Sequence, residues 1–150
     1  MPSESTLGIY IHVPFCVRKC PYCDFYSVPQ TAERIEQYGT ALCRFLRQMQ
    51  TDLPVDTIYF GGGTPSLLPV SLLEEILQTI DKTVSLQQPE ITLECNPATV
   101  DRKTLQQLRE IGINRLSIGV QSLSDVQLKR LGRLHDAKTA IETVEQAAAA

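Results

Sequence analysis

The sequence contains no tryptophan, only two histidines, and no apolar run near the roughly 20 residues that a membrane-spanning helix needs. No run of lysine and arginine is longer than two residues, and the net charge is -3 at pH 7. The chain therefore lacks the basic surface that follows a phosphate backbone. Residues 1–5 have neither the basic nor the apolar part of a signal peptide. We expect a cytoplasmic protein with no transmembrane segment and no nucleic-acid partner.

Cysteine is present in an odd number, five, and three of the five lie within eight residues: Cys16, Cys20 and Cys23. This crowding indicates a metal site in a reducing compartment rather than a set of disulfides. Cys43 lies beside the apolar face of an expected helix, and Cys95 directly follows an expected strand, where it could also lie near a site. We expect these two cysteines to pack in the core.

Short β-forming runs alternate four times with segments of helical periodicity. The expected strands are residues 9–13, 55–60, 91–94 and 114–120, and the apolar positions of residues 35–49 form the face of the first helix. Alternation of this kind predicts an α/β fold in which helices cover a sheet of parallel strands. With 150 residues the chain can form one domain.

Capping residues and glycines mark the expected ends of the later helices. The expected N-terminal caps are Ser71 with Glu74, Ser124 with Gln127, Asp101 and Asp136. Gly112 and Gly132 are expected to end two helices in the left-handed conformation. In the last helix we expect Ile141, Val144 and Ala147 to face the core.

The cysteine loop has the spacing Cys16-x3-Cys20-x2-Cys23 and follows the first expected strand. Ligands of parallel α/β proteins bind at the carboxyl ends of the strands. Three thiolates can hold a [4Fe-4S] cluster and leave one iron open. The amino and carboxylate groups of S-adenosylmethionine could chelate that iron, so that one electron would cleave the C5'–S bond.

Three other interpretations of the cysteine loop remain open at this point. His12 could complete a Cys3His zinc site, which would make the chain a zinc-binding module without redox chemistry. Residues 20–23 read C-P-Y-C, the tetrapeptide of glutaredoxin-like thiol oxidoreductases. The cysteines could also be buried structural residues, but Arg18 and Lys19 favour an exposed, electropositive loop.

Further polar or glycine-rich signals follow the later strands. Residues 61–65 read G-G-G-T-P, which permits a close backbone approach to a ligand or a tight strand-to-helix turn. Glu94 ends the third expected strand, Gln121 ends the fourth, and Arg133 could pair with a ligand carboxylate. Each polar residue taken singly is equally compatible with a solvated surface position.

Five ordered motifs resemble the oxygen-independent coproporphyrinogen III oxidase family of radical S-adenosylmethionine (SAM) proteins. They are residues 10–16, the cysteine trio, 61–65, 94–97, and 118–122 through 131–135. The resemblance implies a partial TIM-like (β/α)6 barrel, of which these residues would form about four βα units. It assigns Cys16, Cys20 and Cys23 to the cluster, and it implies SAM contacts from Tyr10, Tyr22, Gly62, Gly63, Thr64, Glu94, Gln121 and Arg133.

One departure from the family pattern distinguishes between its branches. The oxidases carry a fourth cysteine two residues after the third, where this sequence has Phe25. That pattern resembles the heme-chaperone branch, whose members bind heme and deliver it to respiratory proteins. The resemblance also implies a partner that donates electrons to the cluster. The alternative is the oxidase, a coproporphyrinogen dehydrogenase-type enzyme. In either case residues 1–150 would be the N-terminal portion of the core domain, without its remaining units and C-terminal domain.

Overall fold

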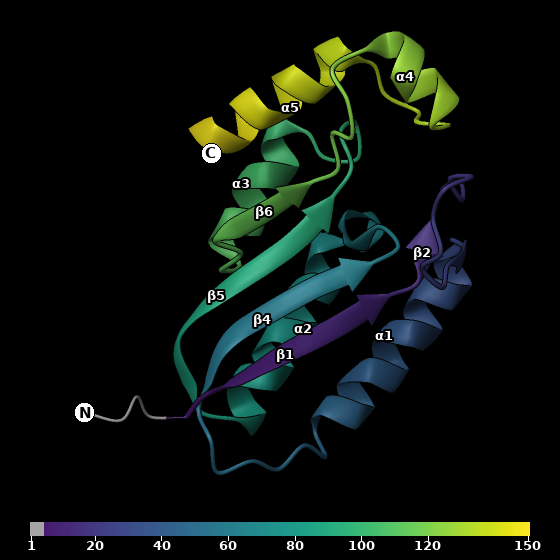
Figure 1. Cartoon of the computed structure of the whole chain (residues 1–150). Helices are drawn as coiled ribbons and strands as arrows, with labels where there is room; N and C mark the ends of the chain where they lie inside the picture. Colours follow the sequence, from purple (N-terminus) through teal and green to yellow (C-terminus); the bar gives the residue numbers. More distant parts are fainter. Residues whose placement is uncertain (1–4) are drawn as a thin grey trace.

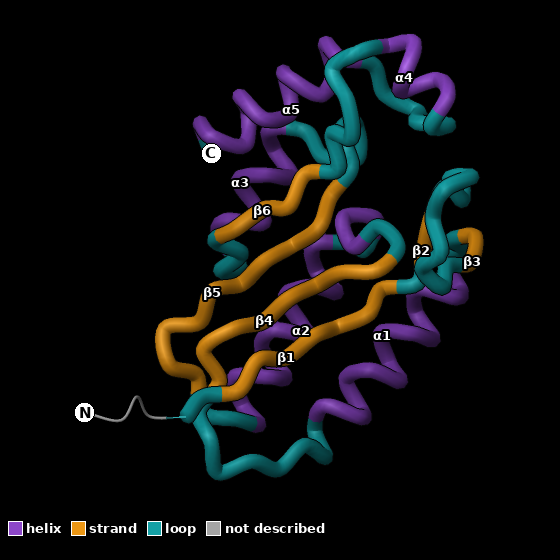
Figure 2. The backbone as a smooth tube through the Cα atoms, viewed as in Figure 1, coloured by secondary structure: helices purple, strands orange, loops and turns teal. Residues whose placement is uncertain are grey.

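Four parallel strands form the main sheet of the computed structural model, which describes residues 5–150. They are β1 (Leu7–Val13), β4 (Val55–Gly62), β5 (Leu86–Cys95) and β6 (Arg115–Ile118). Their spatial order β1-β4-β5-β6 follows their order in the chain (Figure 2). This confirms the expected parallel α/β architecture. Most of the segment that suggested the lack of a signal peptide, residues 1–4, lies outside the described range.

The first three helices lie along one face of this sheet, and the last two lie beyond β6 (Figure 1). The helices are α1 (Ala32–Leu46), α2 (Val70–Thr83), α3 (Arg102–Glu110), α4 (Asp125–Arg130) and α5 (Ala137–Ala149). Contacts join α1 to α2, α2 to α3, and α3 to α5. Within residues 5–150, none of these helices combines the length and the apolar character that crossing a bilayer would require.

The core lies between the sheet and these helices. Strand residues Ile58, Phe60 and Leu93 and helix residues Leu73 and Ile76 are all fully buried. Burying one side chain of this size contributes about 1.5–3 kcal/mol relative to leaving it in water. Cys43 and Cys95 are also buried, which confirms that they pack in the core.

Strand boundaries differ from the expected ones where backbone pairing overrides the side-chain pattern. β4 runs into the glycine segment because Gly61 and Gly62 pair with His12 and Val13 of β1. β5 begins at Leu86, five residues before the expected start, and its first part is irregular, with Gln88 at a φ of 45°. Three short elements were not expected: the paired strands β2 (Phe15–Cys16) and β3 (Val28–Pro29), and a 3-10 helix, η1 (Pro65–Leu67).

Two of the four expected caps are confirmed. The Asp101 and Asp136 side chains accept hydrogen bonds from the backbone N–H groups of Thr104 and Thr139, each at 2.7 Å. The capping box at Ser71 is wrong, since α2 already begins at Val70. The box at Ser124 is also wrong. Ser124 does precede α4, but its side chain makes no cap, and Gln127 instead accepts from the Ser122 hydroxyl at 2.6 Å.

The glycine helix ends were predicted correctly, whereas the inner face of α5 was predicted only in part. Gly112 and Gly132 adopt φ values of +102° and +71°, so the left-handed helix ends are confirmed. Ala147 packs against the core as expected, but Ile141 and Val144 are exposed. α5 instead buries Ala140 and Thr143. Burial of the threonine is possible because its hydroxyl donates to the Thr139 carbonyl at 2.8 Å, within the helix.

Candidate functional site

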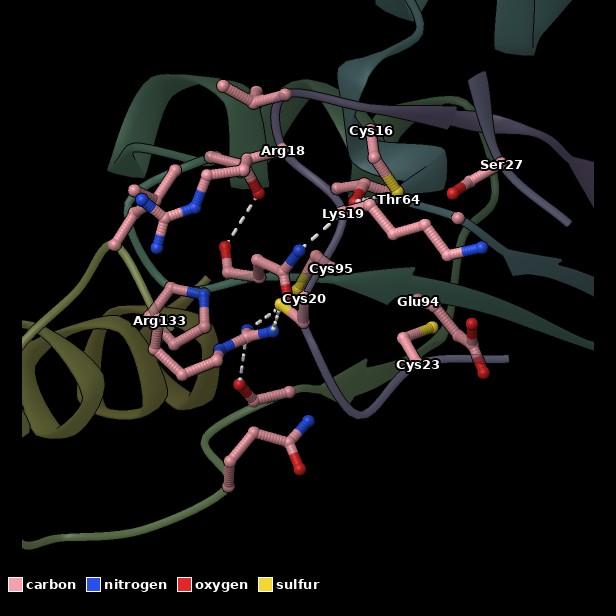
Figure 3. A pocket seen from close by; sticks show the side chains of 18 of the residues that line it. Cys16, Arg18, Lys19, Cys20, Cys23, Ser27, Thr64, Glu94, Cys95 and Arg133 are labelled. Atoms are coloured by element: carbon pink, nitrogen blue, oxygen red, sulfur yellow. Dashed lines mark hydrogen bonds between the residues drawn. The ribbon is translucent and has the colours of Figure 1, made fainter. Parts of the chain in front are cut away.

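A cavity of about 380 Å³ lies at the carboxyl ends of the four parallel strands. Its walls come from the loops that follow β1, β4, β5 and β6 and from the segment between α4 and α5. The cavity brings together all the site residues expected from the sequence except Tyr10. They are Cys16, Cys20, Tyr22, Cys23, Gly62, Gly63, Thr64, Glu94, Gln121 and Arg133. Several of them are labelled in Figure 3.

The cysteine loop lies between the two short strands β2 and β3. The Val28 N–H donates to the Pro14 carbonyl at 2.7 Å, which closes the base of the loop. Near its tip, the Cys23 N–H donates to the Cys20 carbonyl at 3.1 Å and forms a turn. Cys16, Cys20 and Cys23 are all half-buried with free thiols. One short loop therefore presents three accessible sulfur atoms to one cavity.

The chemistry and the placement of these thiols suit an iron-sulfur cluster, which is held by cysteine thiolates. Their positions do not form a finished ligand set: in residues 5–150, no three cysteine, histidine, aspartate or glutamate side chains converge on a metal position. His12 does not line the cavity, and its Nε2 lies 3.0 Å from the Tyr26 carbonyl oxygen. The structure thus does not assemble the Cys3His zinc site considered above.

The glycines after β4 allow close packing against the start of the cysteine loop. A Cβ atom on Gly63 would lie 2.6 Å from the Phe15 carbonyl oxygen and 2.9 Å from that of Val13. Gly62 has a φ of +110°, which side-chain-bearing residues rarely adopt. Its N–H donates to the Glu94 carboxylate at 3.1 Å. The glycine loop therefore couples the cysteine loop to β4 and β5.

Glu94 is held at both carboxylate oxygens. The Tyr59 hydroxyl donates to Oε1 at 2.7 Å, and the Gly62 N–H donates to Oε2. The bond to Glu94 and burial together raise the pKa of Tyr59. Tyr10, which the resemblance places at the site, stacks on Tyr59 with ring centroids 5.8 Å apart and is 56% exposed. Tyr10 thus borders the support of Glu94 rather than the cavity itself.

Arg133 joins three loops through its guanidinium group. Nη2 donates to the Asn96 side-chain oxygen and to the Gly119 carbonyl, the latter at 2.8 Å. Nη1 lies 3.7 Å from the Cys20 sulfur and 3.5 Å from the Tyr22 hydroxyl (Figure 3). Burial raises the pKa of Tyr22, and the positive charge of Arg133 opposes that rise. Nε of Arg133 is buried and has no hydrogen-bond partner among residues 5–150.

The sequence analysis gave no site role to two further cavity residues. Asn96, which lies within the motif of residues 94–97, donates to the Thr64 hydroxyl at 3.0 Å and accepts from Arg133. His135 is 7% exposed, and its Nε2 lies 3.1 Å from the Val120 carbonyl oxygen. Burial lowers the pKa of His135. The position of Asn96 directly after β5, two residues beyond Glu94, was the signal that could have identified it.

Comparison with known proteins gives consistent matches over this arrangement. The family model described as "Radical SAM superfamily" matches residues 10–150. A protein of Haemophilus influenzae named heme chaperone HemW is 39% identical over 98% of this chain and 41% of its own length. Its Escherichia coli namesake is 41% identical over 86% of this chain and 35% of its own length. The chain thus spans about two fifths of these relatives or less.

The solved structures include one with a very similar backbone. The structure described as "Coproporphyrinogen III oxidase (HemN) from Escherichia coli is a Radical SAM enzyme" matches with a TM-score of 0.86 and 26% sequence identity. The match covers 96% of this chain and 34% of that one. A second structure, methylornithine synthase (PylB), matches with a TM-score of 0.53 at 16% identity, which shows a likeness of fold alone.

Proposed function

Because this chain belongs to the radical SAM superfamily, we propose that Cys16, Cys20 and Cys23 hold a [4Fe-4S] cluster and that the cavity beside them binds SAM. The observation that carries the proposal is that the three accessible thiols and the polar residues of four strand ends line one cavity. When bound, the cluster supplies the electron that cleaves the C5'–S bond of SAM.

The residues of the chain divide between holding and orienting these groups. The three cysteines hold the iron, and the open cavity beside them leaves room for a cofactor. Hydrogen bonds from Tyr59 and Gly62 hold the Glu94 carboxylate in one orientation. In that orientation it could accept hydrogen bonds from hydroxyl groups of the cofactor. Arg133 lines the cavity with a positive charge and would pair with the carboxylate of the cofactor. The proposed set of contacts is completed by Tyr22, Gly62, Gly63, Thr64 and Gln121, which line the cavity, and by Tyr10, which does not line it and stacks on Tyr59.

We further infer that the longer protein that carries this segment is a cytoplasmic heme chaperone, which binds heme and delivers it to respiratory proteins. Relatives named heme chaperone HemW, 39% and 41% identical, support this proposal. Phe25 supports it as well: it lines the cavity and is 60% exposed, where the oxidases of the family carry another cysteine. The similarity to the HemN structure keeps oxidative decarboxylation of coproporphyrinogen III as the second candidate.

Anaerobic reconstitution followed by iron, sulfide and zinc analysis tests the cluster. We expect about four irons and four sulfides per chain, as in a [4Fe-4S] centre. Cys16→Ser, Cys20→Ser and Cys23→Ser should each lose most of the iron, whereas Cys43→Ala, which removes a buried cysteine outside the cavity, should keep it. A colourless, sulfide-free protein with bound zinc would overturn the proposal.

Electron paramagnetic resonance and heme transfer test the two remaining parts. The spectrum of the reduced cluster should change when SAM is added, because the cofactor binds beside it. The longer protein should transfer heme to an apo-cytochrome without converting coproporphyrinogen III to protoporphyrinogen IX. Turnover of the porphyrinogen under anaerobic, reducing conditions would instead establish the oxidase.

A further inference from the structure

Asn96 occupies the centre of a hydrogen-bond path that crosses the cavity. Its side-chain nitrogen donates to the Thr64 hydroxyl at 3.0 Å, and its side-chain oxygen accepts from the Arg133 guanidinium. Thr64 is buried, with 4% of its surface exposed, and Arg133 also binds the Gly119 carbonyl. One amide group therefore fixes two side chains that come from separate loops.

Both ends of this path reach a sulfur atom. The Thr64 hydroxyl donates to Cys16 Sγ at 3.8 Å, and Arg133 Nη1 donates to Cys20 Sγ at 3.7 Å. Figure 3 shows Thr64 beside Cys16 and Arg133 beside Cys20. Two of the three clustered cysteines thus accept a hydrogen bond from a donor that Asn96 holds. For Cys23 no such donor is found within residues 5–150.

The backbone of Asn96 is fixed by a second set of hydrogen bonds, which involves neither Arg133 nor Thr64. Its carbonyl accepts from the Thr99 N–H at 3.1 Å and from the Thr99 hydroxyl at 2.6 Å. The Thr99 hydroxyl is in turn 2.7 Å from the Ser66 hydroxyl. The turn after β5 is therefore held in place independently of Arg133 and Thr64, which is what a support for these two residues requires.

Gly119 gives an independent sign that the Asn96–Arg133 contact is a built feature. A Cβ atom at this position would lie 2.8 Å from the Asn96 side-chain oxygen and 3.3 Å from Arg133 Nη2. Gly119 is not among the glycines with positive φ in residues 5–150. The backbone conformation of this residue therefore does not require glycine. The requirement comes from the Asn96–Arg133 pair, which occupies the space that a Cβ atom would need.

We propose that Asn96 is a positioning residue that aims Thr64 and Arg133 at the sulfur ligands Cys16 and Cys20, and so raises the reduction potential of the cluster. This inference rests on the proposed function. Hydrogen bonds to the sulfur atoms stabilise the more negatively charged, reduced cluster, and they are among the factors that set its potential. Asn96 itself contacts neither sulfur and acts only through its two partners.

The test is the midpoint potential of the reconstituted protein, measured by redox titration with paramagnetic resonance detection. For Asn96→Ala we expect a more negative midpoint. At a fixed potential, the ratio of reduced to oxidised cluster should fall by about tenfold, the effect of losing one charge-assisted hydrogen bond. Thr64→Val should shift the midpoint in the same direction, and Thr64→Ser, which keeps the hydroxyl, should restore most of the wild-type value.

Two more variants separate positioning from general damage. Asn114→Ala removes an asparagine that bonds the Ile91 N–H at 2.8 Å outside the cavity, and its midpoint should equal that of the wild type. Gly119→Ala crowds the Asn96–Arg133 pair without removing a polar group, and it should shift the midpoint as Asn96→Ala does. It carries the test if Asn96→Ala retains no iron.

Either of two results would contradict this inference and leave the proposed function intact. The first is an intact cluster with an unchanged midpoint in Asn96→Ala, or in Gly119→Ala where Asn96→Ala retains no iron. The second is a midpoint that Asn114→Ala shifts equally. Wild-type protein that forms no cluster would instead overturn the proposed function, and this inference with it. Iron content and midpoint potential, measured on the same samples, distinguish these outcomes without any assay of turnover.

Discussion

At the scale of single residues, the five cysteines divide into two chemical environments. Burial raises the pKa of Cys95 to about 11 and also raises the pKa of Cys43. The side chains of both lie in the core, on the sheet and on α1 respectively. The other three thiols are half-buried and line the cavity. Cys95 also lines the cavity but is only 3% exposed, so the loop cysteines are the most accessible to iron or to an alkylating reagent.

Pulse alkylation of the metal-free chain should therefore modify Cys16, Cys20 and Cys23 well before Cys43 and Cys95. At pH 8 a thiol with a pKa of about 11 is ionised in about one molecule in a thousand, and the thiolate is the reactive form. Raising the pH toward 10 should accelerate modification of Cys95 by about tenfold per unit. Peptide mass spectrometry after timed quenching gives each rate.

The opposite result is easily recognised. If Cys95 reacts at pH 8 as fast as the loop cysteines, it is not buried as described. Full unfolding in denaturant provides the matched control, because all five cysteines should then react at similar rates.

The sequence predicted the residues of the site better than the bonds between them. Cysteine spacing and the positions of Glu94 and Gln121 at strand ends were sufficient to predict that these residues lie close together. The reason is that parallel strands bring their carboxyl ends to one edge of the sheet. The contact of Arg133 with Asn96 was not predictable. It joins residues 37 positions apart, and it depends on how the α4–α5 segment folds back over the cavity.

At the scale of the elements, periodicity predicted the order of strands and helices, whereas local motifs predicted their ends less well. The aspartate caps were correct because a carboxylate before a helix has few competing partners. The serine capping boxes failed because α2 starts one residue earlier, at Val70, and because Gln127 found the Ser122 hydroxyl. Thr31, which accepts from the Arg34 N–H at 3.2 Å, is a cap that the sequence analysis missed.

This difference predicts opposite effects for two helix-start variants. Thr31→Ala removes a side-chain cap and should lower the free energy of unfolding by about 1 kcal/mol. Ser71→Ala removes no cap and places a better helix former inside α2, so it should be neutral or stabilising by up to about 0.5 kcal/mol. Urea denaturation followed by circular dichroism measures both. Equal destabilisation by the two variants would contradict the cap assignment.

At the scale of the whole molecule, four parallel strands and their helices match the corresponding part of a solved radical SAM enzyme closely. The strands β1 and β6 are the two outer strands of the described sheet. The face opposite the helices carries polar side chains such as Tyr59 and Glu94, which bond to each other. At the end of this face, the cavity presents carboxylate, hydroxyl and guanidinium groups that can contact a polar cofactor.

The proposal that heme binding belongs to the longer protein predicts that these 150 residues alone take up no stoichiometric heme. Heme iron is commonly held by histidine, methionine, cysteine or tyrosine side chains. Nε2 of both histidines faces a backbone carbonyl oxygen, at 3.0 Å for His12 and 3.1 Å for His135, which favours the protonated, non-ligating form of that nitrogen. Met49 packs against the core, so within residues 5–150 the loop cysteines are the most accessible sulfur ligands.

Anaerobic titration with hemin, followed by its Soret absorption, should therefore show only weak uptake by the chain. That uptake should disappear when Cys16, Cys20 and Cys23 are all replaced by serine, because the loop thiolates cause it. The longer protein should bind about one heme per chain at a site that survives the same three substitutions. A tight one-to-one complex of the serine variant of residues 1–150 would place the heme site inside this segment, and the division of labour proposed here would then be wrong.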